Sequence, residues 1–485
     1  MALLLVRTAS GQAIPDTTTR PRALFVEVGG LAATSQQTPF WLRSRQYGTI
    51  PLDNPAGLVR LGGVLNRDLT SQPQGLRLKL GAEMVGQTSP SGTRVLLPEA
   101  YSQLRLGRFE LYAGRRREVF GLVDTLLSSG SYAWSGNALP LPKVQLGTAG
   151  FVPLGFTRGV VAIKALYAHG WFGRADSVQG SFLHQKALFA RLSLLKHRLR
   201  VYAGATHYAQ WGGRRRAGTL AKDGTLPGSL SDYWQVIRAA EPPAADSAKY
   251  VEIDRLNRVG NHLGSIDVAL EWLGERSQWL AYYQHPFEDK SGVAFQNLPD
   301  GLYGIRWKTN RPAASSFQFR QLTLELLLTT DQSGFDIKTG SRLYDGADDY
   351  FNNYQYSDGW TYRQRVVGTP FLTRTVDARP ELRDVKGGFG PIMISNNRVE
   401  VLHVGLLGGW PSGTQIRALL SVGQNDGRPI QSDPRLPKNQ FSGLIAATVP
   451  VNWLGKASLN LSLALDQGGW LPTSVGGAAS LRVNI

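Results

Sequence analysis

Apolar and polar residues alternate one by one along many segments of this chain. Every second residue is apolar from Leu76 to Met84, and the pattern returns from Ser265 to Trp272 and from Lys456 to Asp466. This period places apolar side chains on one face of a β-strand and polar side chains on the other. Many of the segments reach about ten residues, the length of a tilted membrane-spanning strand. The pattern therefore favours a transmembrane barrel over a β-sandwich, whose strands are usually shorter.

Short turns and long connections also alternate along the chain. Gly107 and Arg108 join two such segments in a register that puts Leu106 opposite Phe109 and Arg105 opposite Glu110. We expect further tight joins at residues 195–197, 274–275, 411–413 and 454–455, and the longest connections at about 210–261 and 330–397. Outer-membrane barrels show this asymmetry, with short periplasmic turns and long extracellular loops.

These patterns predict an all-β protein, a single antiparallel transmembrane barrel of about eighteen strands. An even strand number returns both ends of the wall to the periplasmic side. Because the alternation slips at Gln321 and around Leu402 and His403, we expect β-bulges there. The expected strands are 23–34, 57–67, 75–87, 97–106, 109–118, 143–151, 157–168, 183–194, 198–209, 262–273, 276–286, 302–309, 317–329, 398–408, 414–424, 438–451, 456–466 and 478–485.

The N-terminal segment differs from the rest of the chain. The apolar stretch Ala2 to Val6 and the small residue Ala13 resemble the end of a secretory signal, although Arg7 interrupts it and no basic leader precedes it. We therefore expect residues 1–22 to be a residual signal and lead-in, and residues 23–485 to form one barrel domain.

The chain carries a large excess of positive charge. It has 53 Lys and Arg against 36 Asp and Glu, a formal net charge of +17, which favours acidic partners. At an outer surface these partners are an acidic polysaccharide, lipopolysaccharide and outer-membrane lipid. Nucleic acid is not expected, because no known binding motif for it is present. The absence of cysteine excludes disulfides and cysteine-based metal sites.

The stretch DDYFNNYQYSDGWTY, residues 348–362, is the strongest candidate for ligand binding. Its six aromatic rings alternate with amides and carboxylates. Rings of this kind stack on the apolar faces of sugars, while amides and carboxylates bond to hydroxyl groups. The same composition also suits a packed loop that folds inward and seals a barrel, and the sequence leaves both interpretations open.

Several tracts resemble the capsule assembly Wzi family of outer-membrane barrels. They are residues 39–44 (PFWLRS), 127–146 (LSSGSYAWSGNALPLPKVQL), 350–363 (YFNNYQYSDGWTYR) and 396–400 (NNRVE). The resemblance implies an eighteen-stranded, lectin-like barrel that holds capsular polysaccharide at the cell surface. Many relatives have Arg where this chain has Leu139, so a contact made by that Arg is absent or moved here. Since few residues precede the first strand, a plug would have to come from inward-folded loops.

The candidate polysaccharide-binding residues follow from the aromatic stretch, the family tract and two arginine triplets, whose guanidinium groups suit carboxylates and phosphates. The triplets could instead be solvated loop bases or contacts with lipid headgroups. The candidates are Asp348, Asp349, Tyr350, Phe351, Asn352, Asn353, Tyr354, Tyr356, Trp360, Tyr362, Ser135, Asn137, Arg115, Arg116, Arg117, Arg214, Arg215 and Arg216.

Charged residues on the predicted inner face could line a conducting lumen or form a lattice of ion pairs that closes it, and the sequence favours the lattice. These residues are Arg77, Lys79, Glu83, Arg105, Glu110, Asp267, Glu271, Arg417, Lys456 and Arg482.

Catalytic and metal-binding patterns have little support in the sequence. No HExxH or GxSxG motif occurs, and the spacing of Asp345, Asp348 and Asp349 does not match an EF-hand loop. We expect no enzyme activity, no cofactor and no metal site. The sequence predicts a monomeric protein of the Gram-negative outer membrane that binds extracellular polysaccharide and supports capsule assembly or attachment. The alternatives are a porin or exporter channel and an outer-membrane enzyme acting on glycan or lipid.

Overall fold

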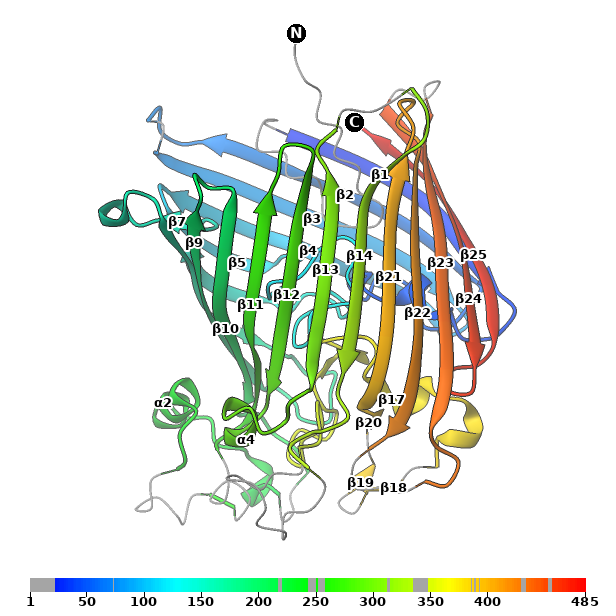
Figure 1. Ribbon diagram of the computed structural model, residues 1–485. Coiled ribbons are helices and arrows are strands. Elements are labelled where there is room, and N and C mark those ends of the chain that lie inside the picture. The colour runs from blue at the N-terminus through cyan, green and yellow to red at the C-terminus, as the bar shows by residue number, and fades with distance from the viewer. Residues whose placement is uncertain are drawn as a thin grey trace.

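A closed β-barrel dominates the structure (Figure 1). The computed structural model describes residues 22–72, 74–216, 220–242, 250–251, 258–311, 315–334, 348–384, 386–387, 390–391, 393–428, 433–451 and 456–485. In this part of the chain, eighteen long antiparallel strands form the wall, and the last strand pairs with the first. The predicted fold class and strand number are confirmed. The predicted lead-in, residues 1–22, lies almost wholly outside the described residues.

Each predicted strand overlaps one strand of the wall. Two-residue β7 (Val152–Pro153) extends the hairpin between β6 and β8. The wall strands are β1 (Arg22–Ala33), β2 (Ala56–Asp68), β3 (Leu76–Ser89), β4 (Gly92–Leu106), β5 (Phe109–Arg115), β6 (Lys143–Thr148), β8 (Val161–Trp171), β9 (Phe182–Leu194), β10 (Leu199–Trp211), β11 (Asn261–Leu273), β12 (Ser277–Phe287), β13 (Gly301–Thr309), β14 (Gln318–Leu328), β21 (Arg398–Gly409), β22 (Gln415–Gly427), β23 (Lys438–Val451), β24 (Lys456–Gly468) and β25 (Ser474–Asn484).

The register follows the alternation of the sequence. Leu106 lies opposite Phe109 and Arg105 opposite Glu110, as predicted. The bulge expected at Gln321 is present, because the pairing of β14 with β21 shifts between Phe319 and Gln321. The bulge expected around residues 402–403 is wrong, since both ladders of β21 run there without a shift.

The outer face of the wall is apolar. Leu80 and Met84 on β3, and Leu461 and Leu463 on β24, all point outward and are exposed. Near the short turns, Trp272, Trp279 and Trp307 lie side by side on β11, β12 and β13. An apolar band with aromatic residues at its edge is the lipid-facing surface of a transmembrane barrel.

The two ends of the barrel differ as predicted. Strand β1 begins and strand β25 ends at the end with the short turns, and helices α2 (Leu230–Arg238) and α4 (Lys290–Val293) lie at the other end (Figure 1). One outer connection is shorter than expected, because β4 begins at Gly92 and only Pro90 and Ser91 separate it from β3. No helix within the described residues is long and apolar enough to cross a membrane.

Three connections fold into the barrel and form a plug, which we define as residues 34–55, 116–142, 348–384 and 393–397. The plug contains helix α1 (Phe40–Arg43) and short strands β15 (Thr361–Tyr362), β16 (Arg365–Val366), β17 (Thr373–Arg374) and β20 (Ile394–Asn396). Strands β18 (Lys386–Gly387) and β19 (Gly390–Pro391) of the third connection lie at the outer end of the barrel (Figure 1). Trp41 and Leu127 pack against Leu419 and Leu444 of the wall, and Trp134 and Trp360 belong to a second cluster. The expectation that inward-folded loops would supply a plug is confirmed.

Ion pairs connect the plug to the inner wall. The Glu83 carboxylate lies 2.7 Å from Arg117, and Arg116 bridges Glu110 and Glu118, each at 2.6 Å. On the opposite wall, Glu271 pairs with Arg200 and Arg306. The predicted lattice is present at these places, although the ion-pair partner of Glu110 is Arg116 of the plug and not the cross-strand Arg105.

Candidate functional site

The aromatic stretch 348–362 lies inside the plug. Five of its rings are buried, those of Tyr350, Phe351, Tyr356, Trp360 and Tyr362. Tyr354 is the exception, with 45 % of its surface exposed. The Trp360 indole donates to the carbonyl of Ala133, and the Tyr350 hydroxyl donates to Asp300. The buried rings therefore help to seal the barrel, and Tyr354 is the one ring of the stretch that is exposed.

The polar residues of this stretch hold the plug together. Asp349 forms an ion pair with Arg428 and accepts hydrogen bonds from Asn397 and Asn352. The Asn352 amide also bonds to the backbone of Ile394, and the Asn353 carbonyl caps the backbone of Gln355 and Tyr356. Each of these predicted binding residues has a structural partner.

The acidic residues at the start of the stretch are buried. Asp348 accepts a hydrogen bond from Ser333, and burial beside Asp289 raises the pKa of the Asp348 carboxyl well above its usual range. Within the described residues, no group of three or more histidine or acidic residues has metal-binding geometry. Asp345, the third acidic candidate, lies outside the described residues.

Ser135 and Asn137 of the second tract are also buried. The Ser135 hydroxyl donates to Gly368, and the Asn137 amide donates to Val366. The Asn137 carbonyl accepts from the backbone of Arg45. These residues join the three plug segments to one another.

The two arginine triplets lie in different environments: the first is mainly in the interior, and the second is at the outer end. Arg116 and Arg117 are engaged in the interior ion pairs, and Arg115 donates to the Tyr362 hydroxyl at 2.9 Å. In the other triplet, Arg215 donates to the carbonyls of Tyr354 and Gln355. Arg214 and Arg216 are exposed at the outer end. The structure thus brings both triplets to the aromatic stretch, mainly through side chains that are already paired.

A basic pocket lies directly after the stretch, between the β3–β4 hairpin and the β15–β16 hairpin of the plug. Its volume is about 150 Å³, and its polar lining includes Gln87, Arg94, Arg363, Gln364 and Arg365. Arg94 lies opposite Gln87 in the β3–β4 register. Because β3 ends and β4 begins at the end with the long loops, this pocket faces the cell exterior.

The backbone of the β15–β16 hairpin holds two of these side chains at its tip. Arg363 has φ 48° and Gln364 has φ 63°, left-handed conformations that cost roughly 1 kcal/mol or more for residues with a Cβ. Both side chains are exposed. Strain of this kind is concentrated at functional positions in proteins.

The electrostatics of the basic pocket favour an anion. Arg365 is buried, and burial together with Arg43 and Arg374 lowers the pKa of its guanidinium to about 9, which leaves it charged at neutral pH. Among the described residues, Asp53 is the one carboxylate that lines the pocket, and it accepts hydrogen bonds from Ser89 and the backbone of Ser91. Although partial burial acts in the opposite direction, these bonds lower the pKa of Asp53.

Sequence reasoning did not select Arg94, Arg363 or Gln364 as site residues. Arg363 ends the aromatic tract, and the run Arg-Gln-Arg at 363–365 was the available signal. Leu139 lines the same pocket. The arginines of this pocket therefore come from β4 and the plug hairpin.

Comparison with solved structures identifies the type of barrel. The structure of Wzi from Escherichia coli, described as an outer membrane protein involved in group 1 capsule assembly and a carbohydrate-binding β-barrel, is similar, with a TM-score of 0.59, 15% identity, and 94% of this chain and 84% of that chain covered. The chain is an outer-membrane β-barrel. With its apolar outer band, the fold belongs in the outer membrane of a Gram-negative bacterium.

Two barrels from Pseudomonas aeruginosa are more distantly similar. OpdL has a TM-score of 0.45 and 9% identity, with 96% of this chain and 98% of that chain covered. OccK5 has a TM-score of 0.44 and 8% identity, with 96% and 97% covered. No protein-family model matches the chain, and no curated protein matches it either.

Proposed function

We propose that this barrel binds an acidic extracellular polysaccharide at its outer end and supports the assembly or attachment of a capsule. The observation that carries the proposal is the basic pocket, where Arg94, Arg363 and Arg365 meet amide side chains and the single carboxylate, Asp53, accepts hydrogen bonds from Ser89 and Ser91. Guanidinium groups bind carboxylates with paired hydrogen bonds, and amides bond to sugar hydroxyls.

The tracts that resemble the Wzi family support the same function, as does the similarity to Wzi of E. coli, which is described as carbohydrate-binding. Lipopolysaccharide is a second acidic partner for this end of the barrel. We propose a monomer that acts by binding and not by catalysis, because Asp348 and Asp349 are held by hydrogen bonds within the plug.

Binding of an acidic polysaccharide to the purified protein tests the proposal. We expect the double variant Arg94→Gln, Arg363→Asn to bind at least about tenfold more weakly at low salt, because two charged contacts are lost. Asn is chosen at 363 because it tolerates a left-handed backbone. The matched control is Arg311→Gln, an exposed arginine at the end with the short turns. Equal binding by the double variant and the wild type would refute this site.

A further inference from the structure

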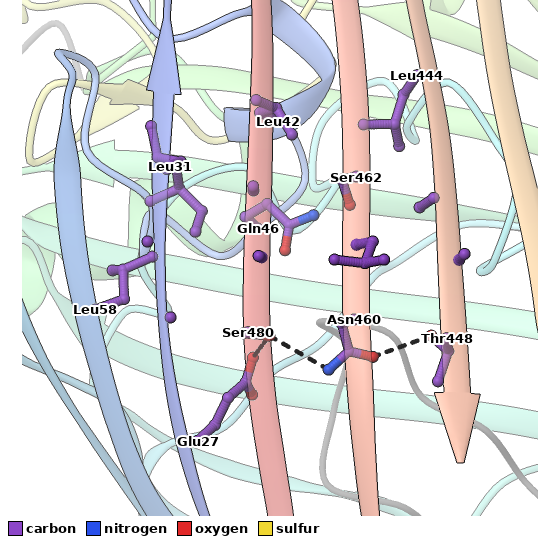
Figure 2. A pocket seen from close by; sticks show the side chains of 18 of the residues that line it. Glu27, Leu31, Leu42, Gln46, Leu58, Leu444, Thr448, Asn460, Ser462 and Ser480 are labelled. Carbon is purple, nitrogen blue, oxygen red and sulfur yellow. Dashed lines mark hydrogen bonds between the residues drawn. The ribbon is translucent and has the colours of Figure 1, made fainter. Parts of the chain in front are cut away.

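A second cavity lies inside the barrel, on the wall formed by β1, β25, β24 and β23 (Figure 2). Its volume is about 110 Å³, room for roughly seven to eleven water molecules or a single sugar unit. Trp41 and Leu42 of helix α1 cover one side, and Leu31 and Leu444 of the wall line others. This internal cavity is separate from the basic pocket and shares with it one lining residue, Ile50.

The internal cavity lies near mid-height of the barrel wall. Glu27, Asn460 and Ser480 are close to the middle of β1, β24 and β25.

Arg417 is the residue of this cavity that points to an anionic ligand. It lines the internal cavity from β22, is only 8 % exposed, and its Nε has no hydrogen-bond partner. Its cross-strand neighbours are Leu407 and Ala446, and no ion pair joins it to any carboxylate of the described residues. A buried charge without a partner is costly, so an arginine held in this way is poised for an anion.

The remaining polar groups of the internal cavity separate into used and available side chains. Arg60, the second arginine of the lining, donates to Thr49 and lies 3.8 Å from the Glu83 carboxylate. Thr448, Asn460, Ser480 and Glu27 form a continuous hydrogen-bonded chain across four strands, as the dashed lines in Figure 2 partly show. The carboxylate of Glu27 is further engaged by Arg482 at 3.6 Å. Gln46 and Ser462 face the same space, and no side-chain hydrogen bond to another described residue occupies either of them.

We infer that this internal cavity binds one small sugar unit that bears an oxyanion, either a carboxylate or a phosphate. Arg417 receives the anionic group, Gln46 and Ser462 bond to hydroxyls, and the leucine side chains pack against the apolar face of the ring. The site is independent of the proposed outer site, because the polar side chains that would hold the ligand are different ones.

Binding of glucuronate and of glucose 6-phosphate to the purified full-length protein in detergent tests the inference, with glucose as the neutral probe. The two charged probes distinguish a carboxylate from a phosphate as the preferred group. We expect at least one of them to bind, and Arg417→Gln to weaken that binding about tenfold to a hundredfold. The control Arg200→Gln changes an arginine of the opposite wall that already pairs with Glu271, and it should bind as the wild type does.

Three results would overturn the inference: no binding of either charged probe, equal binding of glucose, or full binding by Arg417→Gln. If Arg417→Gln does not fold, Ser462→Leu replaces it, because its larger side chain occupies the cavity and should abolish binding while Arg417 remains. Full binding by Ser462→Leu would then overturn the inference. The double variant Arg94→Gln, Arg363→Asn should retain this binding, which separates failure here from failure of the outer site.

Discussion

Among single residues, Asp377 has the greatest structural importance in the plug. Its carboxylate accepts from Arg43 at 3.0 Å and from Arg374 at 3.0 and 3.1 Å, and all three side chains are buried. Although burial alone would raise it, the guanidinium groups of Arg374 and Arg43 hold the pKa of Asp377 well below its usual range. Asp377 therefore joins two plug segments that are far apart in the sequence.

Replacing Asp377 should destabilise the protein strongly. Asp377→Asn leaves Arg43, Arg374 and Arg365 buried without a carboxylate, so we expect the free energy of unfolding to fall by about 3–5 kcal/mol. Urea unfolding in lipid vesicles measures the change. The control is Asp68→Asn, which breaks the ion pair between Asp68 and Arg77. Because the Asp68 side chain is 69% exposed and the Arg77 side chain is 50% exposed, this change should cost less than about 1 kcal/mol. Equal losses would contradict this account.

Among elements, the stretch 348–362 is held partly by buried acidic groups whose pKa values are raised. Glu288 accepts from the backbone of Phe351 and from Tyr132, and burial, with nearby Asp348 and Asp349, raises its pKa well above its usual value. Asp348 is shifted in the same direction. Arg428 is the cation beside this acidic group, and it is paired with Asp349.

The stretch should therefore loosen as pH rises. A raised native pKa means that the stabilising contribution is complete below the unfolded pKa near 4 and is lost as pH passes the native pKa. Between the unfolded and the native pKa, we expect the hydrogen-exchange protection factors of residues 348–362 to fall by up to about tenfold per pH unit for each of the two groups. The double variant Glu288→Gln, Asp348→Asn should remove this dependence, whereas exposed Glu275→Gln should leave it unchanged. A pH dependence that persists in the double variant would exclude these two groups as its cause.

At the scale of the whole molecule, the plug determines whether solutes can pass through the barrel. Barrels of this strand number enclose an aqueous channel when nothing fills them. Here the plug packs against the inner wall through two apolar clusters and the ion pairs of Glu83 with Arg117, Glu110 with Arg116 and Arg306 with Asp124. These contacts favour a binding barrel over an open porin.

We expect the wild-type protein to be nearly silent in single-channel recordings in a planar bilayer. A variant that lacks residues 348–397, with β14 and β21 joined by a short flexible linker, should conduct, because the largest plug segment is gone. Removal of residues 222–240, which include α2 at the outer end, is the matched control and should not open the channel. A wild type that conducts as well as the plug deletion would favour the porin alternative.

The wall of this barrel was predictable because strand geometry is local. Alternation at Leu76 to Met84 assigns each side chain to lipid or lumen, and the tight turn at Gly107 sets Arg105 opposite Glu110. The slip at Gln321 likewise marked a real bulge. These features depend on residues close to one another in the sequence, and each was visible without a structure.

The contents of the barrel were not predictable, because they depend on residues far apart in the chain. Local pattern could not show that Trp360 is buried against Ala133, that Glu110 pairs with Arg116, or that Arg363 joins Arg94 in one pocket. Nor could it show that Arg417 faces a cavity and has no ion-pair partner among the described residues. The sequence by itself determined a transmembrane wall with basic, aromatic loops. Only the tertiary structure decided which side chains seal the lumen and which remain available to a ligand, since burial and charge pairing are set by long-range contacts.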